Sequence, residues 1–285
     1  MTLRIEPRNA TLGADIYGVN LNKGVSDADF QEIWRAWLEH AVLVFPEQHL
    51  TEEAQVAFSR RFGRLERMTL KSTKEIIDLS NVGRDGRVVD AASAQALFLE
   101  GNAIWHADST FRTYMPKAGF LVARQCPATG GETEFSDTRA AYDMLSPDRK
   151  ALLEGLEAVH DYVWAQSLIG GMEFIHPDAR KEMYPVTQSV VQVHPDTGRK
   201  HMVIGRYASH IVGWSVEEGR ALLRELEEFT VQPPRVIAHA WKPGDAVLWD
   251  NRCVLHRGRP FSLAEARVMR RTTIADDHPE NVWAL

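Results

Sequence analysis

The spacing of apolar side chains over the first third of the chain predicts alternating helices and strands. Residues 26–38 place apolar side chains at helical intervals after Ser26 and two aspartates, so they predict a capped amphipathic helix. A second helix is expected over residues 51–62, where Gly63 can end it. Short apolar runs predict strands at 41–45 and 76–82, and a turn is expected at 83–86.

The rest of the chain consists mostly of short apolar or β-branched runs separated by Gly, Pro and Asp, which is typical of strands. Strands are expected at 119–126, 133–135, 158–163, 190–193, 202–204, 236–240, 246–249 and 268–274, and helices at 138–145, 147–156 and 215–229. This pattern predicts a mainly β fold with helical insertions, a β-sandwich or jelly roll. Residues 84–101 and 165–189 show no persistent period, so both are candidate active-site loops.

The composition is that of an ordinary globular protein, and it excludes several kinds of partner. The 285 residues include 33 Lys+Arg and 39 Asp+Glu, a net charge of −6, without a basic block. Nucleic acids and anionic membranes need clustered positive charge, so neither is expected as a partner. The apolar runs are far shorter than the ~20 residues of a membrane helix, and no secretory signal opens the chain. Two cysteines cannot form a disulfide framework, so the cytoplasm is the expected compartment.

The densest chemical signal is the pair His106 and Asp108. Residues two apart on an extended segment point to the same side, so the imidazole and the carboxylate can bind one metal ion. A second histidine, His256, follows the predicted strand at 246–249, where the chain runs off the strand end. Two histidines and one carboxylate form the facial triad of non-haem Fe(II) oxygenases, although zinc hydrolases accept the same ligands. On the ligands alone, both readings stay open.

Two arginines near the C-terminus favour an enzyme that binds carboxylates. Arg267 and Arg271 lie four residues apart on a predicted strand, so they share a face at a separation of about 13 Å. Each guanidinium can hold a different carboxylate, one on a co-substrate and one on a substrate. Arg270 faces the other way, where a surface ion pair is the expected role.

The order of these residues carries a family resemblance. His106 and Asp108, Thr133 twenty-five residues on, His256, and Arg267 eleven residues later resemble the Fe(II)/2-oxoglutarate dioxygenases of the taurine dioxygenase family. The resemblance covers nearly the whole chain and implies a single domain over 1–285 with the double-stranded β-helix (jelly roll) fold. The segments most similar to the 2,4-dichlorophenoxyacetate (aryloxyalkanoate) dioxygenase branch are 79–82, 130–135, 138–143 and 249–259.

The resemblance also implies roles for individual residues. It assigns His106, Asp108 and His256 as iron ligands, Thr133 and Arg267 as ligands of the distal carboxylate of 2-oxoglutarate, and Arg271, Asn102 and Lys71 as substrate-binding residues. The segment 204–210, which contains Arg206, also resembles the phenoxyacetate branch, and it is either a pocket wall or a structural loop. The implied cofactors are Fe(II), 2-oxoglutarate and O₂.

The implied reaction hydroxylates a small anionic substrate, an aryloxyalkanoate, on the carbon beside the ether oxygen. The resulting hemiacetal collapses to a phenol and a 2-oxo acid, as in herbicide degradation. A sulfonate or alkylsulfate dioxygenase of the same family is the alternative, because Arg271 can bind any oxyanion. A zinc hydrolase or a non-catalytic metal-binding jelly roll is the alternative of a different class. The sequence leaves open a homo-oligomer and the preferred enantiomer.

Overall fold

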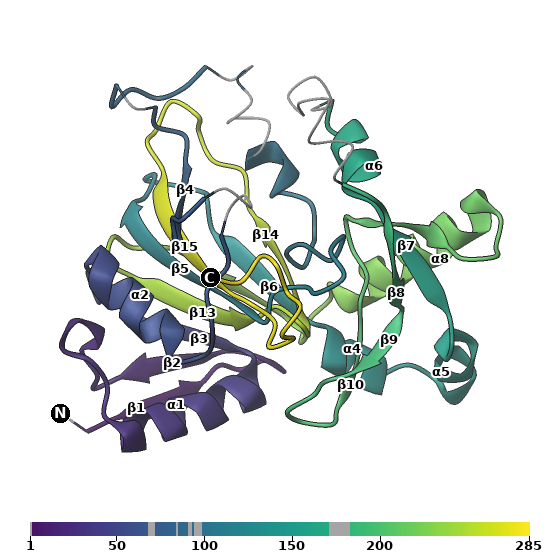
Figure 1. The fold of residues 1–285 in the computed structure, drawn as a ribbon, viewed down its shortest axis with the longest axis horizontal. Helices are drawn as coiled ribbons and strands as arrows, with labels where there is room; N and C mark the ends of the chain where they lie inside the picture. The colour runs from purple at the N-terminus through teal and green to yellow at the C-terminus, as the bar shows by residue number, and fades with distance from the viewer. Residues whose placement is uncertain (1, 68–71, 84, 91–92, 94–98, 171–182) are drawn as a thin grey trace.

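A computed structural model of the protein describes residues 2–67, 72–83, 85–90, 93, 99–170 and 183–285 (Figure 1). The strands are β1 (Arg4–Pro7), β2 (Ala14–Tyr17), β3 (Val42–Phe45), β4 (Ile76–Ser80), β5 (Ala118–Gln125), β6 (Thr133–Asp137), β7 (Glu157–His160), β8 (Val186–Ser189), β9 (Val191–Val193), β10 (Lys200–Met202), β11 (Ala208–Ile211), β12 (Val236–His239), β13 (Ala246–Asp250), β14 (Val254–Gly258) and β15 (Val268–Ile274). The helices are η1 (Leu21–Lys23), α1 (Asp27–His40), α2 (Glu52–Arg60), α4 (Thr138–Asp143), α5 (Pro147–Leu153), α6 (Tyr162–Ser167) and α8 (Val216–Thr230).

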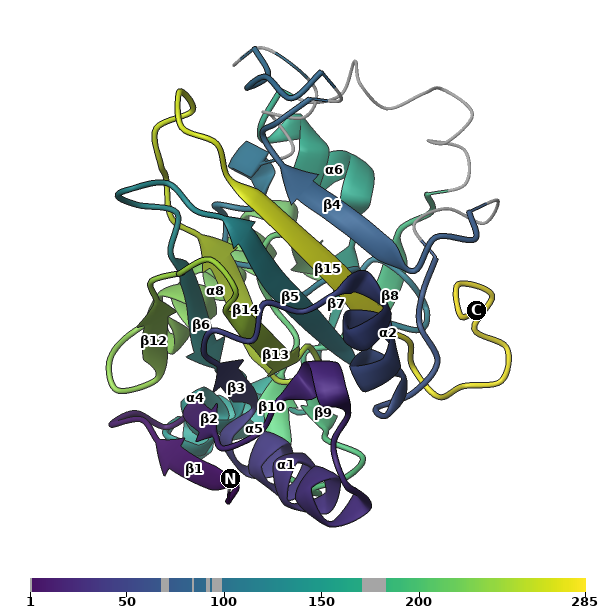
Figure 2. The same cartoon turned by 90° about the vertical axis from the view of Figure 1, so that its left-hand side faces the viewer.

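A large mixed sheet forms the centre of the molecule. Its order among the described residues is β1-β2-β3-β13-β5-β15-β4, and β2 and β3 are its parallel neighbours. Figure 2 shows β4, β15 and β5 running side by side across this sheet. A smaller antiparallel sheet has the order β12-β6-β14.

The large sheet has apolar side chains on both faces because successive residues of each strand point to opposite sides. On the outer face, Phe120 and Leu248 pack with Trp37 of α1 and Phe58 of α2. On the inner face, a second cluster joins Leu121 and Val247 of the large sheet to Phe135, Ile237 and Val254 of the small sheet. The two sheets therefore face each other across a shared core, and residues of β5, β6, β14 and β15 can meet between them.

A second lobe, on the right of Figure 1, contains the sheet β11-β7-β8, the hairpin β9–β10, and the helices α4, α5, α6 and α8. Leu222 and Leu226 of α8 are buried against Ala158 of β7 and Ile211 of β11. Leu255 of β14 and Trp105 belong to the same cluster, so this lobe packs directly against the segments that carry His256 and His106.

Local signals in the sequence predicted several elements well. The side chains of Ser26, Thr51 and Ser215 accept hydrogen bonds from backbone N–H groups at the starts of α1, α2 and α8. The strand predicted over 268–274 is β15. These elements were predictable because caps and apolar periodicity act within a few residues.

Other predictions were wrong at positions where capping or edge pairing decides the outcome. The strand predicted over 158–163 ends at His160, because the Asp161 side chain accepts the Trp164 N–H and starts α6. The helix predicted over 147–156 ends at Leu153. The strand predicted at 202–204 is centred earlier, at Lys200–Met202, and the one at 190–193 is preceded by a separate strand, β8. The short strands β1, β2 and β11 were not predicted.

The two segments predicted as active-site loops are only partly described. Residues 84, 91–92, 94–98 and 171–182 lie outside the described residues, while residues 99–101 are helical and β8 occupies the end of the second segment. Among the helices of the described residues, none has the length and apolar character that crossing a bilayer requires.

Candidate active site

The two histidines singled out in the sequence are joined through their backbones. His106 and His256 form an isolated antiparallel bridge, in which each N–H donates to the other residue's carbonyl oxygen at 3.0 and 2.7 Å. His256 follows the end of β13, as predicted, but it lies within the next strand, β14 of the small sheet, which was not predicted. The ring centroids are 4.2 Å apart, and both side chains are buried.

Asp108 completes a compact cluster with these imidazoles. Its carboxylate oxygens lie 3.9 Å from Nε2 of His106 and 3.8 Å from Nε2 of His256, and the potential ligand atoms are all within 4.8 Å of one another. These separations exceed hydrogen-bond distances. Three buried donors thus surround a space without bonding directly to each other, which is the arrangement expected of ligands for one ion.

The protonation states suit a metal. Burial lowers the pKa of His106, and it lowers that of His256 to about 3, so both imidazoles are neutral near pH 7. Burial alone would raise the pKa of Asp108, but Arg271 and the imidazoles outweigh it and hold that pKa at about 2. The Nδ1 of His106 lies 2.7 Å from the Ile104 carbonyl oxygen, which accepts its proton and leaves the Nε2 lone pair available. The donor set therefore fits a divalent transition metal.

The buried amide of Asn251 fixes the backbone of Asp108, a role that was not predicted from the sequence. The Asn251 Oδ1 accepts the Asp108 N–H at 2.7 Å, and its Nδ2 donates to the carbonyl oxygens of Asp108 and Pro116, both at 3.0 Å. Asn251 lies in the turn between β13 and β14 and is completely buried. Its position inside the segment 249–259 was the available signal, but its contacts are distant in sequence.

We expect Asn251→Ala to weaken metal binding by about 10- to 100-fold, because an amide that orients a ligand residue has effects of that size. The measurement is a titration of the metal-free protein with Co(II), followed by ligand-field absorbance. Asn251→Asp is the matched comparison, since it keeps the acceptor for the Asp108 N–H and loses both donors. Unchanged Co(II) affinity in Asn251→Ala would contradict this positioning role.

Arg271 is not a free cation. Its Nη1 donates to both oxygens of Asp108, at 2.8 and 2.9 Å, so the guanidinium neutralises the carboxylate that faces the imidazoles. The sequence placed Arg271 on one face with Arg267, but it gave no indication of this contact across 163 residues. Arg270, by contrast, forms ion pairs with Asp78 and Glu52 on the outside, as expected.

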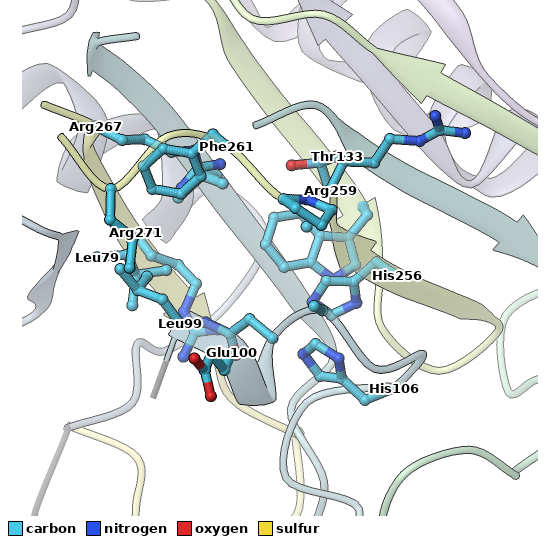
Figure 3. A pocket seen from close by; sticks show the side chains of 17 residues that line it. Leu79, Leu99, Glu100, His106, Thr133, His256, Arg259, Phe261, Arg267 and Arg271 are labelled. Carbon is cyan, nitrogen blue, oxygen red and sulfur yellow. The ribbon is translucent and has the colours of Figure 1, made fainter. Parts of the chain in front are cut away.

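A cavity of about 260 Å³ opens beside the histidines. Its walls are Leu79, Leu99, Glu100, Asn102, Ala103, His106, Leu121, Thr133, Trp249, His256, Gly258, Arg259, Pro260, Phe261, Leu263, Arg267 and Arg271. Figure 3 shows the two imidazoles together, with Arg267 and Phe261 farther along the cavity. Most of the cavity surface is apolar, and a few cations project into it, as is usual for sites that bind small organic molecules.

Thr133 and Arg267 both line this cavity, from β6 and from the residue before β15. The Thr133 hydroxyl oxygen accepts the indole N–H of Trp241 at 2.9 Å, so its own proton remains available to a ligand. Burial lowers the pKa of Arg267 to about 10, and its Nη2 donates to the Gly131 carbonyl oxygen at 3.3 Å. Gly131 has φ +72°, and a Cβ there would lie 3.3 Å from Nε of Arg267, so glycine leaves room for the guanidinium.

The Asn81 side chain holds the backbone that presents Arg267. Its Oδ1 accepts the Arg267 N–H at 2.7 Å, and its Nδ2 donates to the Glu265 carbonyl oxygen at 2.8 Å. Asn81 is completely buried. Asn81 lies in the segment 79–82 that carries part of the family resemblance, but its role was not predictable, because the partners lie 186 and 184 residues away.

Of the two remaining predicted site residues, Asn102 and Lys71, the structure describes only Asn102. Asn102 lines the cavity, and its carbonyl oxygen accepts the Gly258 N–H at 2.8 Å. Lys71 lies outside the described residues.

A second buried group, His194 with Asp250 and Cys253, has metal-like spacing.

That second group already has a structural use. Both carboxylate oxygens of Asp250 accept hydrogen bonds from Arg252, at 2.8 and 2.7 Å, and Nε2 of His194 lies 2.9 Å from Asp250. The Nδ1 of His194 accepts the N–H groups of Asp196 and Thr197. With these lone pairs occupied, the group stabilises the turn after β9 and is not a second metal site.

Comparison with known proteins identifies the family. The sequence pattern described as "Taurine catabolism dioxygenase TauD, TfdA family" matches residues 4–273. The chain is 43% identical over 289 residues to a protein of Sphingobium herbicidovorans named (S)-phenoxypropionate/alpha-ketoglutarate-dioxygenase, covering 99% of this chain and 97% of the relative. It is 38% identical over 285 residues to an alpha-ketoglutarate-dependent 2,4-dichlorophenoxyacetate dioxygenase of Cupriavidus pinatubonensis, with 97% and 99% covered.

A solved structure supports the same family assignment. The crystal structure of AAD-2 in complex with Mn(II) and N-oxalylglycine has a TM-score of 0.91 and 38% identity, with 98% of each chain covered. The predicted chemistry of Fe(II), 2-oxoglutarate and O₂ is confirmed at the level of the family, and the zinc hydrolase and non-catalytic alternatives are excluded with it. The chain belongs to the taurine catabolism dioxygenase TauD, TfdA family of Fe(II)- and 2-oxoglutarate-dependent dioxygenases.

Proposed function

We propose that this enzyme hydroxylates an aryloxyalkanoate on the carbon beside the ether oxygen. One oxygen atom of O₂ enters that C–H bond and the other enters 2-oxoglutarate, which leaves as succinate and CO₂. The hemiacetal then breaks its C–O bond to give a phenol and a 2-oxo acid. The observation that carries the proposal is the cavity beside His106 and His256, which combines apolar walls with the cations Arg267 and Arg271. The names of the relatives with 43% and 38% identity support the same substrate class.

His106, Asp108 and His256 are proposed to hold the iron. The neutral imidazoles and the ionised carboxylate are the ligand forms that Fe(II) requires. Bound Fe(II), together with 2-oxoglutarate and O₂, supplies the oxidant for removal of hydrogen from the substrate. The three residues are 3, 8 and 7% exposed, so the protein keeps bulk water away from this chemistry.

Thr133 and Arg267 are proposed to bind the distal carboxylate of 2-oxoglutarate. Arg267 projects into the cavity, and it forms no ion pair with any carboxylate among the described residues. A guanidinium and a hydroxyl together can satisfy both oxygens of a carboxylate. Asn81 already fixes the Arg267 backbone. The segment that presents Arg267 therefore loses little conformational freedom when 2-oxoglutarate binds.

Arg271 is proposed to bind the anionic head of the substrate, with Asn102 and Lys71 contributing polar contacts. One Arg271 nitrogen is already bonded to Asp108, so the substrate would use the remaining donors of the fork. The anionic nature of the substrate follows from these cations and is part of the proposal.

We further infer that the two facing sheets form a double-stranded β-helix (jelly roll) within a single domain over 1–285. The shared core between β5, β13 and β15 on one side and β6, β12 and β14 on the other supports this fold. A cytoplasmic location is also proposed, supported by the two free cysteines, Cys126 and Cys253.

The test is a substrate panel of phenoxyacetate, both enantiomers of 2-phenoxypropionate, taurine and an alkyl sulfate. We expect succinate and phenol to form in equal amounts from an aryloxyacid, only when Fe(II), 2-oxoglutarate and O₂ are all present. Succinate formation that depends on taurine or the alkyl sulfate, and not on any aryloxyacid, would refute the proposal in favour of a sulfonate or alkylsulfate dioxygenase.

We expect Arg271→Ala to raise the aryloxyacid KM by about tenfold or more, since a charge-assisted hydrogen bond is lost, while 2-oxoglutarate binding stays nearly intact. The misplaced C–H bond should also uncouple the reaction, so that succinate exceeds phenol. Steady-state kinetics with both products quantified gives the measurement. Arg270→Ala is the matched control, because that neighbouring arginine points outward to Asp78 and Glu52. A wild-type KM and equal product amounts in Arg271→Ala would remove Arg271 from the substrate site.

A further inference from the structure

The indole of Trp241 is hydrogen-bonded to Thr133, one of the residues proposed to bind 2-oxoglutarate. The Trp241 Nε1 donates to the Thr133 Oγ1 at 2.9 Å. Among the described residues, Thr133 is part of the cavity wall and Trp241 is not. Trp241 therefore acts on a molecule in the cavity indirectly, through the hydroxyl that it contacts.

The pairing of β12 with β6 brings the two side chains together. His239, the last residue of β12, is the register partner of Thr133, the first residue of β6. Register partners point to the same face of a sheet, and a residue two positions further along an extended chain points to that face again. Trp241 follows His239 by two residues, which explains why its indole reaches Thr133 on the neighbouring strand.

A buried pair, His239 and Asp245, supports the indole. The ring centres of Trp241 and His239 are 4.7 Å apart, and the rings are nearly perpendicular at 81°. The Nε2 of His239 lies 3.1 Å from Oδ2 of Asp245, whose carboxylate also accepts the N–H groups of Lys242 and Glu47, both at 3.0 Å. Because three contacts fix Asp245, the imidazole and the indole packed on it have little freedom to move.

The hydrogen bond from Trp241 determines what the Thr133 hydroxyl can do. An indole N–H can only donate, so the Thr133 oxygen is the acceptor, and the hydroxyl keeps one proton to donate elsewhere. Threonine hydroxyls commonly donate to a nearby backbone carbonyl oxygen. Among the described residues, Trp241 is the hydrogen-bond partner of this hydroxyl and no oxygen accepts its proton. The proton is therefore left for a group inside the cavity that Thr133 lines.

Burial of an indole does not by itself produce such a bond. Trp37 and Trp249 are 0 and 2% exposed, and their Nε1 atoms have no hydrogen-bond partner in the part of the chain that the structure describes. Trp241 is only partly buried, yet its N–H is bonded to Thr133. The bond is thus a particular feature of this position in the fold.

Thr133 and the guanidinium of Arg267 are tied to the same short stretch of chain. The Arg267 Nη2 donates to the Gly131 carbonyl oxygen at 3.3 Å, and Gly131 precedes Thr133 by two residues. One oxygen of a carboxylate can accept from the hydroxyl while the other accepts from the guanidinium. This arrangement requires a hydroxyl proton that points at the carboxylate.

We propose that Trp241 is a positioning residue for 2-oxoglutarate: its indole N–H holds the Thr133 oxygen so that the Thr133 proton is donated to the distal carboxylate. His239 and Asp245 contribute by fixing the indole. The inference rests on the proposed function, because it takes Thr133 and Arg267 as the residues that bind this carboxylate. A residue outside the cavity would then contribute to the choice between 2-oxo acids.

The test compares 2-oxoglutarate with 2-oxopentanoate, in which a methyl group replaces the distal carboxylate. Both are titrated by calorimetry into the full-length protein loaded with Co(II), so binding is measured without turnover. Trp241→Phe keeps an aromatic ring beside His239 and loses the donor. We expect it to weaken 2-oxoglutarate binding by about 3- to 10-fold, the size of one neutral hydrogen bond, and to leave 2-oxopentanoate binding unchanged. A merely structural role of the indole would weaken the binding of both acids alike.

A double substitution tests whether the effect passes through Thr133. Thr133→Val keeps the shape of the side chain and should reduce the preference for 2-oxoglutarate by about tenfold or more, since a hydrogen bond to a charged group is lost. Trp241→Phe added to Thr133→Val should then cause no further loss. Trp214→Phe is the matched control, because Trp214 is an exposed tryptophan between β11 and α8, and it should keep the wild-type preference.

The outcomes separate this inference from the proposed function. A wild type without the preference, or a preference that survives both Thr133→Val and Arg267→Ala, overturns the proposed carboxylate site and the role of Trp241 with it. A preference that is lost in Thr133→Val but unchanged in Trp241→Phe overturns the positioning role alone. Equal weakening of both acids in Trp241→Phe, or a further loss in the double variant, has the same consequence. A loss confined to 2-oxoglutarate, and absent when Thr133 is already valine, supports the role of Trp241.

Discussion

Replacing Asp108 with alanine is expected to abolish turnover and metal binding together. The carboxylate lies between both Nε2 atoms at 3.9 and 3.8 Å, so its removal takes away the anionic member of the cluster. Arg271 then also loses the carboxylate that neutralises it, and an unpaired cation faces the two imidazoles. We expect metal affinity to fall by more than the loss of about 10- to 100-fold that follows removal of a residue hydrogen-bonded to a metal ligand. Co(II) titration and substrate-dependent succinate formation measure the two effects.

His106→Ala should behave in the same way, and the fold should largely survive both changes. His210→Ala is the matched control, because His210 is a partly exposed histidine of β11 whose Nδ1 contacts Ser209, away from the cluster. Circular dichroism checks the fold of each variant. Activity above a few per cent in Asp108→Ala, with no formate or acetate added to replace the lost carboxylate, would contradict the proposed ligand set.

The parts of the site that were predicted from sequence depend on local order along the chain. The strand over 268–274 was predictable from its own apolar and β-branched residues, and it presents Arg267 and Arg271 from one edge of the cavity. The pair His106 and Asp108 was visible because its members are two residues apart. The fixed order of these residues with Thr133 and His256 carried the family resemblance, which the comparisons confirm.

The parts that were missed depend on contacts between distant segments. The hydrogen bonds of Asn251 to Asp108 join residues 143 apart, and those of Arg271 to Asp108 join residues 163 apart. These hydrogen bonds form only when the two sheets pack face to face, so they cannot be predicted from local sequence. Arg206 was left open between a pocket wall and a structural loop for the same reason, because its hydrogen-bond partner Gln166 lies 40 residues away in the sequence.

Three guanidinium groups lie in or beside the proposed active site. Arg267 and Arg271 come from the large sheet, and Arg206 comes from the second lobe beside His106. Of these three, Arg271 is neutralised by Asp108, while the structure shows Arg267 bonded to a backbone carbonyl and Arg206 to an amide. Arg267 is therefore available to the carboxylate of the co-substrate, and the remaining donors of Arg271 are available to the proposed anionic substrate. The separate variants of Arg267 and Arg271 can therefore assign each anion to its arginine.

Arg267→Ala is expected to raise the apparent KM for 2-oxoglutarate by about tenfold or more, because it removes a charge-assisted pair worth ~1.5 to 3 kcal/mol. The kcat should fall less, since Arg267 contacts neither His106 nor His256 through any hydrogen bond in the described structure. Direct titration with 2-oxoglutarate, in the presence of Fe(II) and without O₂, measures the affinity.

Two further variants show whether the guanidinium itself is responsible. Arg267→Lys keeps the charge but loses the fork, so its affinity for 2-oxoglutarate should lie between those of the wild type and Arg267→Ala. Arg257→Ala is the control, because Arg257 of β14 pairs with Glu134 at 2.7 Å and does not line the cavity. If 2-oxoglutarate binds Arg267→Ala as tightly as the wild type, the distal carboxylate must be held elsewhere. In that case the charge of Arg267, buried and held by Asn81 without a carboxylate partner among the described residues, would need another ligand to explain it.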